Sequence, residues 1–168
     1  SMSRFFTGWS RVFLVFVITA GSQMALGIDR TIVGEISTAV IYKQTGEKRA
    51  VSVVGDKKRT LVVFWSRHNQ FAELELKSLC DQRNRLADIE IIAVNIDRIR
   101  PTIADKDSAT AYLKMLGCGF DSYFDSNLTA FGQLGVTVVP STFLIDSTGR
   151  ISWTLAGYLV SSRQKLKD

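Results

Sequence analysis

The sequence predicts an α/β fold in which helices flank a central mixed β-sheet, with a β-hairpin as an N-terminal extension. Two observations carry this prediction. An apolar strand, an amphipathic helix and a second apolar strand follow one another, and this order implies a parallel pair with a right-handed crossover. A further helix and a closing β-hairpin come after them. The 168 residues are enough for one sizeable core, and 46% hydrophobic with 22% charged residues is typical of a folded chain.

The first predicted elements are strands. Residues 38–42 and 49–54 have strand character, and residues 43–47 between them form a turn candidate. A polar loop follows. Residues 61–65, Leu-Val-Val-Phe-Trp, are β-branched, apolar or aromatic without alternation, which indicates a strand covered on both faces.

Helices and strands then alternate. A helix is predicted over 70–87, with an apolar stripe formed by Ala72, Leu76, Leu79, Cys80 and Leu86. A strand over 89–95 and a helix over 105–116 come next, and Gly117 stands where a helix C-terminal glycine belongs. A short helix is expected over 127–133.

The chain closes with a predicted antiparallel hairpin. Residues 142–146 and 150–155 flank Ser147-Thr148-Gly149, a turn that contains glycine. Pro140 stands just before the first of these strands, where a proline removes no hydrogen-bond donor from the sheet.

The N-terminus differs from the rest. Arg4 and Arg11 precede an apolar stretch, and no charged residue occurs from 12 to 28. A basic region, an apolar region and a weak cleavage zone are typical of a signal peptide, and the alternative is an uncleaved membrane anchor. We therefore expect residues 1–28 to direct export and residues 29–168 to form the folded domain. The net charge of +5 is too small to indicate nucleic-acid binding.

Several segments between 38 and 159 carry a family resemblance. They are "LVVFWS", "IIAVNID", "YFDSN", "FGQLGVTVVPSTFLIDSTGRI" and "AGYL". They resemble the exported thioredoxin-like proteins of the TlpA/ResA type, within the AhpC/TSA–redoxin superfamily. The resemblance implies a thioredoxin-like fold in a bacterial protein of the periplasm or the outer face of the inner membrane. It also implies that a proline matching Pro140 follows a cis peptide bond and faces a C-x-x-C motif.

This chain lacks that dithiol motif. Asn69 and Ala72 stand at the two cysteine positions. In such enzymes the first cysteine is activated at a helix N-terminus and the second resolves the mixed disulfide. An amide is neither a nucleophile nor a redox group, whereas asparagine is a favoured N-cap residue. The sequence thus predicts that Asn69 preserves the start of the helix without the chemistry.

The two cysteines lie elsewhere. Cys80 falls on the apolar stripe of the first helix, which favours an inert core thiol, and Cys118 follows a helix end and is the more reachable of the two. The resemblance implies that the two helices lie on opposite faces of the sheet, so both cysteines are expected to be unpaired. His68, the single histidine, is expected to be an exposed loop residue, and no metal or cofactor is expected.

The leading functional hypothesis is a binding or accessory module of the cell envelope that takes a protein or an extended peptide. Its expected binding residues are the loop residues Arg67, His68, Asn69, Gln70 and Phe71, together with Val139, Pro140, Arg98 and Arg100. The alternative is a thiol–disulfide or peroxide oxidoreductase that uses Cys118 or the thiols of a partner. A third reading is a structural subunit of an envelope complex.

Charge at one sheet edge indicates the kind of partner. The strands 61–65 and 89–95 should end at the same edge, which brings basic residues there with Asp97 as the only acid among them. We expect an electropositive edge and a partly acidic partner, or self-association. Residues 161–168 allow only a short C-terminal helix, so apolar surface next to this edge is expected to remain exposed.

Overall fold

The computed structural model describes residues 32–53, 55, 59–117 and 119–158. The predicted export segment 1–28 and the predicted C-terminal helix 161–168 lie outside the described residues. Within the described part, no helix is long and apolar enough to cross a membrane.

Seven strands, three α-helices and two 3-10 helices make up the described part. In chain order they are β1 (Val40–Lys43), β2 (Lys48–Ala50), β3 (Arg59–Trp65), α2 (Gln70–Asp81), η3 (Arg83–Leu86), β4 (Ile89–Asn95), α3 (Ile103–Met115), β5 (Asp121–Phe124), η4 (Ser126–Leu128), α4 (Thr129–Gln133), β6 (Ser141–Ile145) and β7 (Ile151–Ala156).

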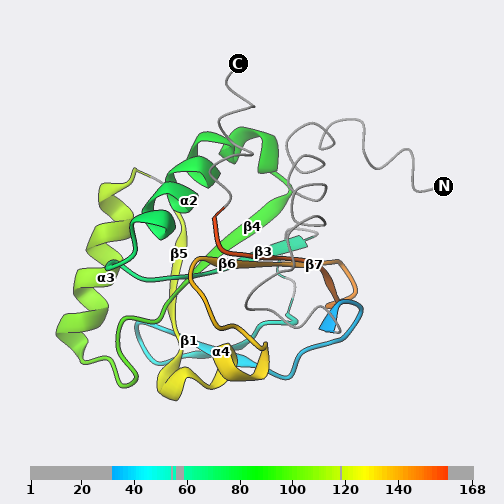
Figure 1. The fold of residues 1–168 in the computed structure, drawn as a ribbon, viewed down its shortest axis with the longest axis horizontal. Helices are drawn as coiled ribbons and strands as arrows, with labels where there is room; N and C mark the ends of the chain where they lie inside the picture. Colours follow the sequence, from blue (N-terminus) through cyan, green and yellow to red (C-terminus); the bar gives the residue numbers. More distant parts are fainter. Residues whose placement is uncertain (1–31, 54, 56–58, 118, 159–168) are drawn as a thin grey trace.

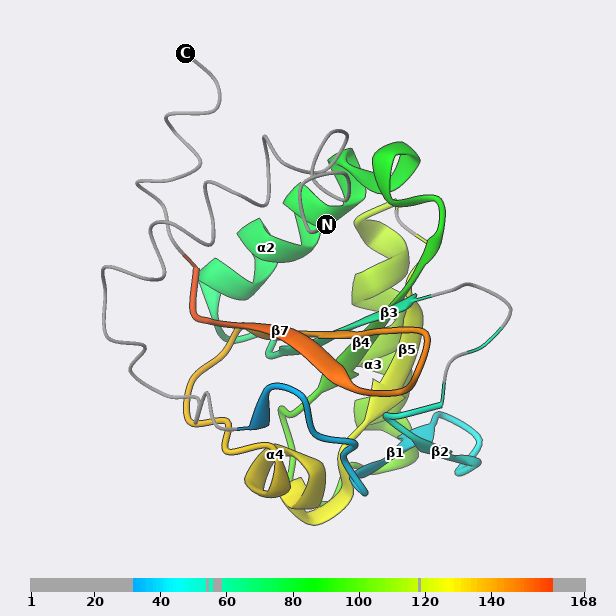
Figure 2. The same ribbon diagram turned by 90° about the vertical axis from the view of Figure 1, so that its right-hand side faces the viewer.

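The strands form one mixed sheet in the order β2-β1-β5-β4-β3-β6-β7. β3 is parallel to β4, and β4 is parallel to β5. The β1–β2 hairpin at one edge and the β6–β7 hairpin at the other pair antiparallel. Figure 2 shows β7 in front and the β1–β2 hairpin toward the lower right. This is the predicted α/β, thioredoxin-like arrangement with an extra N-terminal hairpin.

Two cores lie on opposite faces of the sheet. Along β3, Val62 and Phe64 belong to the core on the α4 side, whereas Leu61, Val63 and Trp65 belong to the core under α2 and α3. Figure 1 shows α2 and α3 on one side of the sheet and α4 on the other. Because both faces are covered, residues 61–65 of β3 are all apolar, as the sequence predicts.

Some element boundaries differ from the prediction. The helix expected over 70–87 ends at Asp81, and a separate 3-10 turn carries Leu86 into the core. The strand β5 was not predicted, since only four residues form it and its pairing with β1 and β4 is not visible in a local pattern. In the helix expected over 127–133, Asn127 and Leu128 have positive φ angles of 60° and 52°, so α4 begins only at Thr129.

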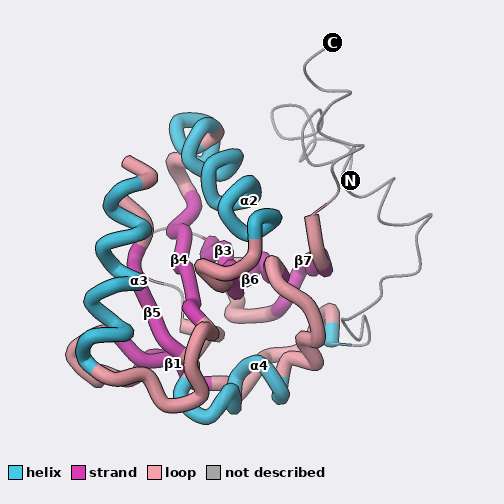
Figure 3. The backbone as a smooth tube through the Cα atoms, turned by 60° about the vertical axis from the view of Figure 1, so that its left-hand side comes forward, coloured by secondary structure: helices cyan, strands magenta, loops and turns pink. Residues whose placement is uncertain are grey.

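The expectation that the two helices lie on opposite faces of the sheet and that both cysteines are unpaired is wrong. α2 and α3 pack on the same face of the sheet, where Leu76 and Leu79 of α2 share a core with Ala109 and Leu113 of α3 (Figure 3). Cys80 is half-buried and disulfide-bonded, and its sulfur lies 3.8 Å from the carbonyl oxygen of Leu116 at the end of α3. Cys118, the other cysteine of the sequence, lies outside the described residues. The opposite-face argument therefore fails for this chain.

Candidate functional site

The candidate site lies where β3 and β4 end. Trp65 and Asn95 are paired residues at the carboxyl ends of these parallel strands. As the sequence predicts, the segments that follow meet at one edge of the sheet. The first of these segments is the loop that leads to Asn69 and α2, and the second leads through Asp97 to α3.

Asn69 joins the start of α2 to the loop before β6. Its Oδ1 accepts hydrogen bonds from the N–H groups of Phe71 (2.9 Å) and Ala72 (3.2 Å), which makes it the N-cap residue that the sequence predicts. Its Nδ2 donates to the carbonyl oxygen of Val139 at 3.0 Å. The Val139–Pro140 peptide bond is cis. All the polar atoms of the Asn69 side chain are therefore engaged in holding two loops together.

Ala72, at the second cysteine position, has no exposed surface. A methyl group fills this place in the core under α2, beside Leu76 and Trp65. In the described part of the chain, neither position of the degenerate motif offers a sulfur, a base or another nucleophile.

Asp97 organises the loops beside Asn69. Its carboxylate accepts from Ser66 Oγ (2.6 Å), from the backbone N–H of Arg67 (3.0 Å), from Arg67 Nε (3.0 Å) and from Asn95 Nδ2 (3.0 Å). Burial raises the pKa of Asp97, but the hydrogen bonds from Ser66, Asn95 and Arg67 outweigh it and hold this pKa below its ordinary value. Asp97 is thus an ionised, inward-facing carboxylate that fixes the conformation of the 66–67 turn.

The other predicted site residues fall into two groups around Asn69. His68, Gln70 and Phe71 are exposed, and the Phe71 ring stacks on Tyr158 with 6.2 Å between ring centroids. Arg98 and Arg100 are exposed residues of the loop between β4 and α3.

The edge carries less net positive charge than the sequence predicts. Arg67 is paired with Asp97, and Arg98 Nε lies 3.8 Å from a second acid, Asp105. Asp105 belongs to the first turn of α3 and was not among the residues expected at this edge, because the predicted helix began there rather than at Ile103. The edge therefore presents individual guanidinium groups rather than a broad basic field.

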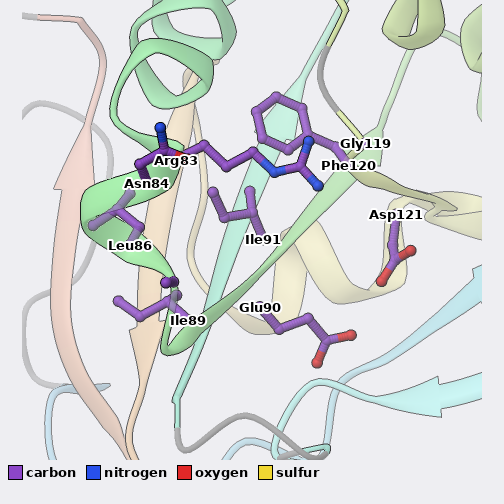
Figure 4. Close-up of a pocket in the computed structure, with 10 residues that line it drawn as sticks. Arg83, Asn84, Leu86, Ile89, Glu90, Ile91, Gly119, Phe120 and Asp121 are labelled. Atoms are coloured by element: carbon purple, nitrogen blue, oxygen red, sulfur yellow. The ribbon is translucent and has the colours of Figure 1, made fainter.

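A cavity of about 320 Å³ lies at the other end of β4 and β5, away from the degenerate motif (Figure 4). Arg83 approaches over Gly119, where a Cβ atom would lie only 3.1 Å from Arg83 Nη2. The Glu90 and Asp121 carboxylates face the cavity below Phe120. This place was not predicted from the sequence, since its residues come from two segments that are far apart in the chain, 83–91 and 119–121.

The carboxylates of this cavity belong to a charge network. Arg49 donates to both carboxylate oxygens of Glu90 at 2.7 Å. The hydrogen bonds from Arg49 lower the pKa of Glu90 despite its partial burial. Burial, followed by the hydrogen bond and the charge of Glu90, raises the pKa of Asp121. The network has a structural role, because it ties Arg49 of the β1–β2 hairpin to Glu90 of β4.

No group of three or more His, Cys, Asp or Glu residues is placed to hold a metal ion in residues 32–53, 55, 59–117 and 119–158.

Two kinds of site residue were not predicted from the sequence. Asn95 and Ser66 act only through Asp97, and no motif marks them. Ile99 and Ile103 are highly exposed, and this follows from the loop's position rather than from a local pattern.

The fold and this site define a thioredoxin-like protein without a dithiol at the head of its active-site helix. Residues 35–154 match the model of the AhpC/TSA family, and the chain belongs to that family. No curated protein matches the chain.

Solved structures with the same fold are similar to this chain at low sequence identity. StoA from Bacillus subtilis is 17% identical with a TM-score of 0.57, covering 78% of this chain and 97% of that one. A thioredoxin-like protein from Porphyromonas gingivalis is 19% identical with a TM-score of 0.64, covering 80% and 88%. A secreted disulfide oxidoreductase of Mycobacterium tuberculosis is 13% identical with a TM-score of 0.58, covering 76% and 91%. At these identities the likeness shows the fold alone.

Proposed function

We propose that this protein is an exported thioredoxin-fold module of the TlpA/ResA type that has lost dithiol exchange and acts by binding a protein or an extended peptide. The observation that carries the proposal is the engagement of Asn69, which stands where the family has its nucleophile. Its side chain caps α2 and donates to Val139, so the position is used for structure.

The loop before Pro140 supports a binding role. In the described part of the chain, nothing accepts a hydrogen bond from the Val139 N–H, whereas the Val139 carbonyl already accepts from Asn69. A carbonyl oxygen has two lone pairs, so a bound peptide can still use both backbone groups of Val139. Recognition of this kind adds an extended segment through main-chain hydrogen bonds and needs no sulfur.

The exposed ring of Phe71 adds an apolar contact on the same side. Phe71 stacks on Tyr158, and the N–H of Gly157 donates to the Pro140 carbonyl at 2.7 Å. The aromatic pair is therefore held next to the loop that contains Val139. A side chain of a peptide bound to the Val139 backbone would contact this aromatic pair.

The alternative, an oxidoreductase that uses a cysteine outside the motif, rests on the family. Cys80 is disulfide-bonded and half-buried, and it lies at the far end of α2 from Asn69. A redox role for it would need a site of its own at the α2–α3 ends. Export to the periplasm or to the outer face of the inner membrane, with membrane attachment only through residues 1–28, is part of the proposal and rests on the N-terminal sequence.

Insulin reduction by dithiothreitol tests the loss of exchange activity. With the unmodified chain, turbidity from reduced insulin should develop no faster than with dithiothreitol alone. The double variant Asn69→Cys with Ala72→Cys should accelerate it, because the helix N-terminus that activates a thiolate is intact. The same double variant in a Cys80→Ser, Cys118→Ser background separates the restored motif from the native cysteines. Catalysis by the unmodified chain that disappears in Cys118→Ser would contradict the proposal.

A further inference from the structure

The loop between β4 and α3 exposes two isoleucines beside the degenerate motif. Ile99 is 60% exposed and Ile103 is 78% exposed. We call residues 98–103 the 98–103 ridge. It adjoins the motif because Arg67, two residues before Asn69, pairs with Asp97 at the start of the same loop. Exposed apolar side chains that lie together and are rimmed by charge are typical of a contact surface.

The ridge is held rigidly. The carbonyl oxygen of Ile99 accepts from the Asn127 N–H at 2.7 Å, and Arg100 Nε donates to Asn127 Oδ1 at 3.3 Å. Asn127 and Leu128 both have left-handed backbone conformations, with φ angles of 60° and 52°. Left-handed residues other than glycine are strained and persist where the surroundings enforce them. This strain is located at the contact that supports Ile99.

The other end of the ridge is fixed by a capping box. Thr102 Oγ1 accepts from the Asp105 N–H at 3.1 Å, and the Thr102 N–H donates to Asp105 Oδ2 at 2.8 Å. Ile103 is the first residue of α3, so the cap determines the direction of its side chain. A surface that is already rigid loses little conformational entropy on binding.

The charges of the ridge are arranged with the cations outward. The side chain of Arg98 is 64% exposed although its Nε lies 3.8 Å from Asp105, whereas the side chain of Asp97 is 3% exposed and its carboxylate is paired with Arg67. Arg100 is also exposed. The outer surface therefore alternates guanidinium groups with isoleucines. Its complement is a surface that carries carboxylates next to large apolar side chains.

One alternative to a protein partner, an anionic membrane, fits less well. An anionic membrane is attracted by an excess of several basic residues near its surface. Here Asp105 and Asp107 lie in the first turns of α3, next to Ile103, and reduce that excess. Discrete guanidinium groups that alternate with apolar side chains instead suit bidentate pairing with individual carboxylates.

We infer that the 98–103 ridge is the docking surface for an acidic protein segment that presents large apolar side chains between its carboxylates. This inference rests on the proposed binding function and names the chemistry of the partner. Ile99 and Ile103 supply the apolar contact, and Arg98 and Arg100 pair with the carboxylates of the segment.

Phage display tests the inference. Random 12-residue peptides on phage are selected for binding to the full chain in mild detergent. The enriched peptides should combine Asp or Glu with Leu, Ile, Phe or Trp. A fluorescein-labelled synthetic copy of an enriched peptide should bind about tenfold more weakly, by fluorescence anisotropy, to Arg98→Glu and to Ile103→Asp, since a central contact is worth at least about 1.4 kcal/mol. Binding should also weaken as NaCl is added.

Matched controls lie far from the ridge. Met115, at the other end of α3, is 78% exposed, as Ile103 is, and Arg85 is an exposed arginine of η3. Met115→Asp and Arg85→Glu should leave peptide binding unchanged. Circular dichroism and urea unfolding of all four variants establish that each is folded.

Four outcomes overturn the inference. One is enrichment of no peptide, or of peptides without acidic residues. Another is equal weakening in the control variants. The third is co-sedimentation of the chain with phosphatidylglycerol vesicles that disappears in Ile103→Asp while peptide binding does not. If peptide binding is lost in Phe71→Ser but not in Ile103→Asp, the ridge proposal fails and the proposed function still stands. If the unmodified chain catalyses insulin reduction, the proposed function itself fails.

Discussion

The side-chain amide of Asn69 donates a hydrogen bond to the carbonyl oxygen of Val139, 70 residues further along the chain, while its oxygen caps α2. One residue thus ties the start of the helix to the loop that precedes β6. The resemblance to TlpA/ResA-type proteins implies a cysteine at this position, and this chain has an amide there instead. Here the same position has become part of the scaffold.

The first prediction separates the two contacts of Asn69. Asn69→Ala should lower the free energy of unfolding by about 1–2 kcal/mol, because it removes the N-cap and the donor to Val139. Asn69→Asp keeps a capping oxygen but cannot donate to Val139, so it should show an intermediate loss. Urea unfolding followed by circular dichroism measures both. If Asn69→Ala is as stable as the unmodified chain, the two contacts contribute nothing measurable.

The second prediction concerns pH. The pKa of Asp97 is lowered in the fold, so its ionised form stabilises the native state above the ordinary pKa of 3.8. That contribution is lost as the pH falls through the lower, folded-state pKa. Asp97→Asn should therefore cost about 2–3 kcal/mol at neutral pH, as expected when a hydrogen-bonded ionic partner is lost, and much less below about pH 3.

Unfolding curves at several pH values test this. Asp81→Asn is the control, since Asp81 is an exposed acid at the end of α2. A pH-independent cost of Asp97→Asn would show that the side chain acts only by shape.

The third prediction concerns Asp121, whose pKa is raised in the fold by burial and by Glu90. For a raised pKa, the stabilising contribution is present below the ordinary pKa of 3.8 and is lost as the pH rises through the folded-state value. Asp121→Asn should therefore raise the unfolding free energy slightly at neutral pH, and the gain should vanish in acid. A neutral-pH loss in Asp121→Asn would mean that its attraction to Arg49 outweighs the repulsion by Glu90.

The fourth prediction concerns the sulfur atoms. Cys80 is disulfide-bonded and the sequence contains one other cysteine, Cys118. Alkylation of the denatured chain without reductant should therefore add nothing to the intact mass, and reduction should expose both thiols. Cys80→Ser should lower the unfolding free energy by about 2–4 kcal/mol under oxidising conditions. Two adducts without reductant would contradict the bond.

Local patterns were enough for much of the fold. The strand predicted over 89–95 matches β4, and the helix start at Gln70 with Asn69 as its N-cap was expected from cap chemistry. The hairpin around Gly149 followed from its turn residues, and that glycine has a φ of +82°. These features depend on side-chain period, capping and turn preference, all of which act within a few residues.

Other features depend on packing between distant segments. β5 has only four residues, and it is a strand because β1 and β4 supply its partners. The left-handed pair Asn127–Leu128 interrupts a plausible helical pattern because its backbone holds Ile99. The prediction that Cys80 is unpaired was wrong because it assumed that α2 and α3 lie on opposite faces of the sheet. The face on which α3 packs is decided by the crossover connection, not by either helix alone.

The sequence by itself determined that this protein has an α/β sheet flanked by helices and that no sulfur stands at Asn69 or Ala72, because strand and helix periods and residue identity are local properties. Only the tertiary structure decided that Asn69 reaches Val139, that Asp97 turns inward to hold Arg67 and that Ile99 and Ile103 stay in solvent. Each of these depends on where chain segments far apart in sequence meet, and that is set by the packing of both faces of the sheet.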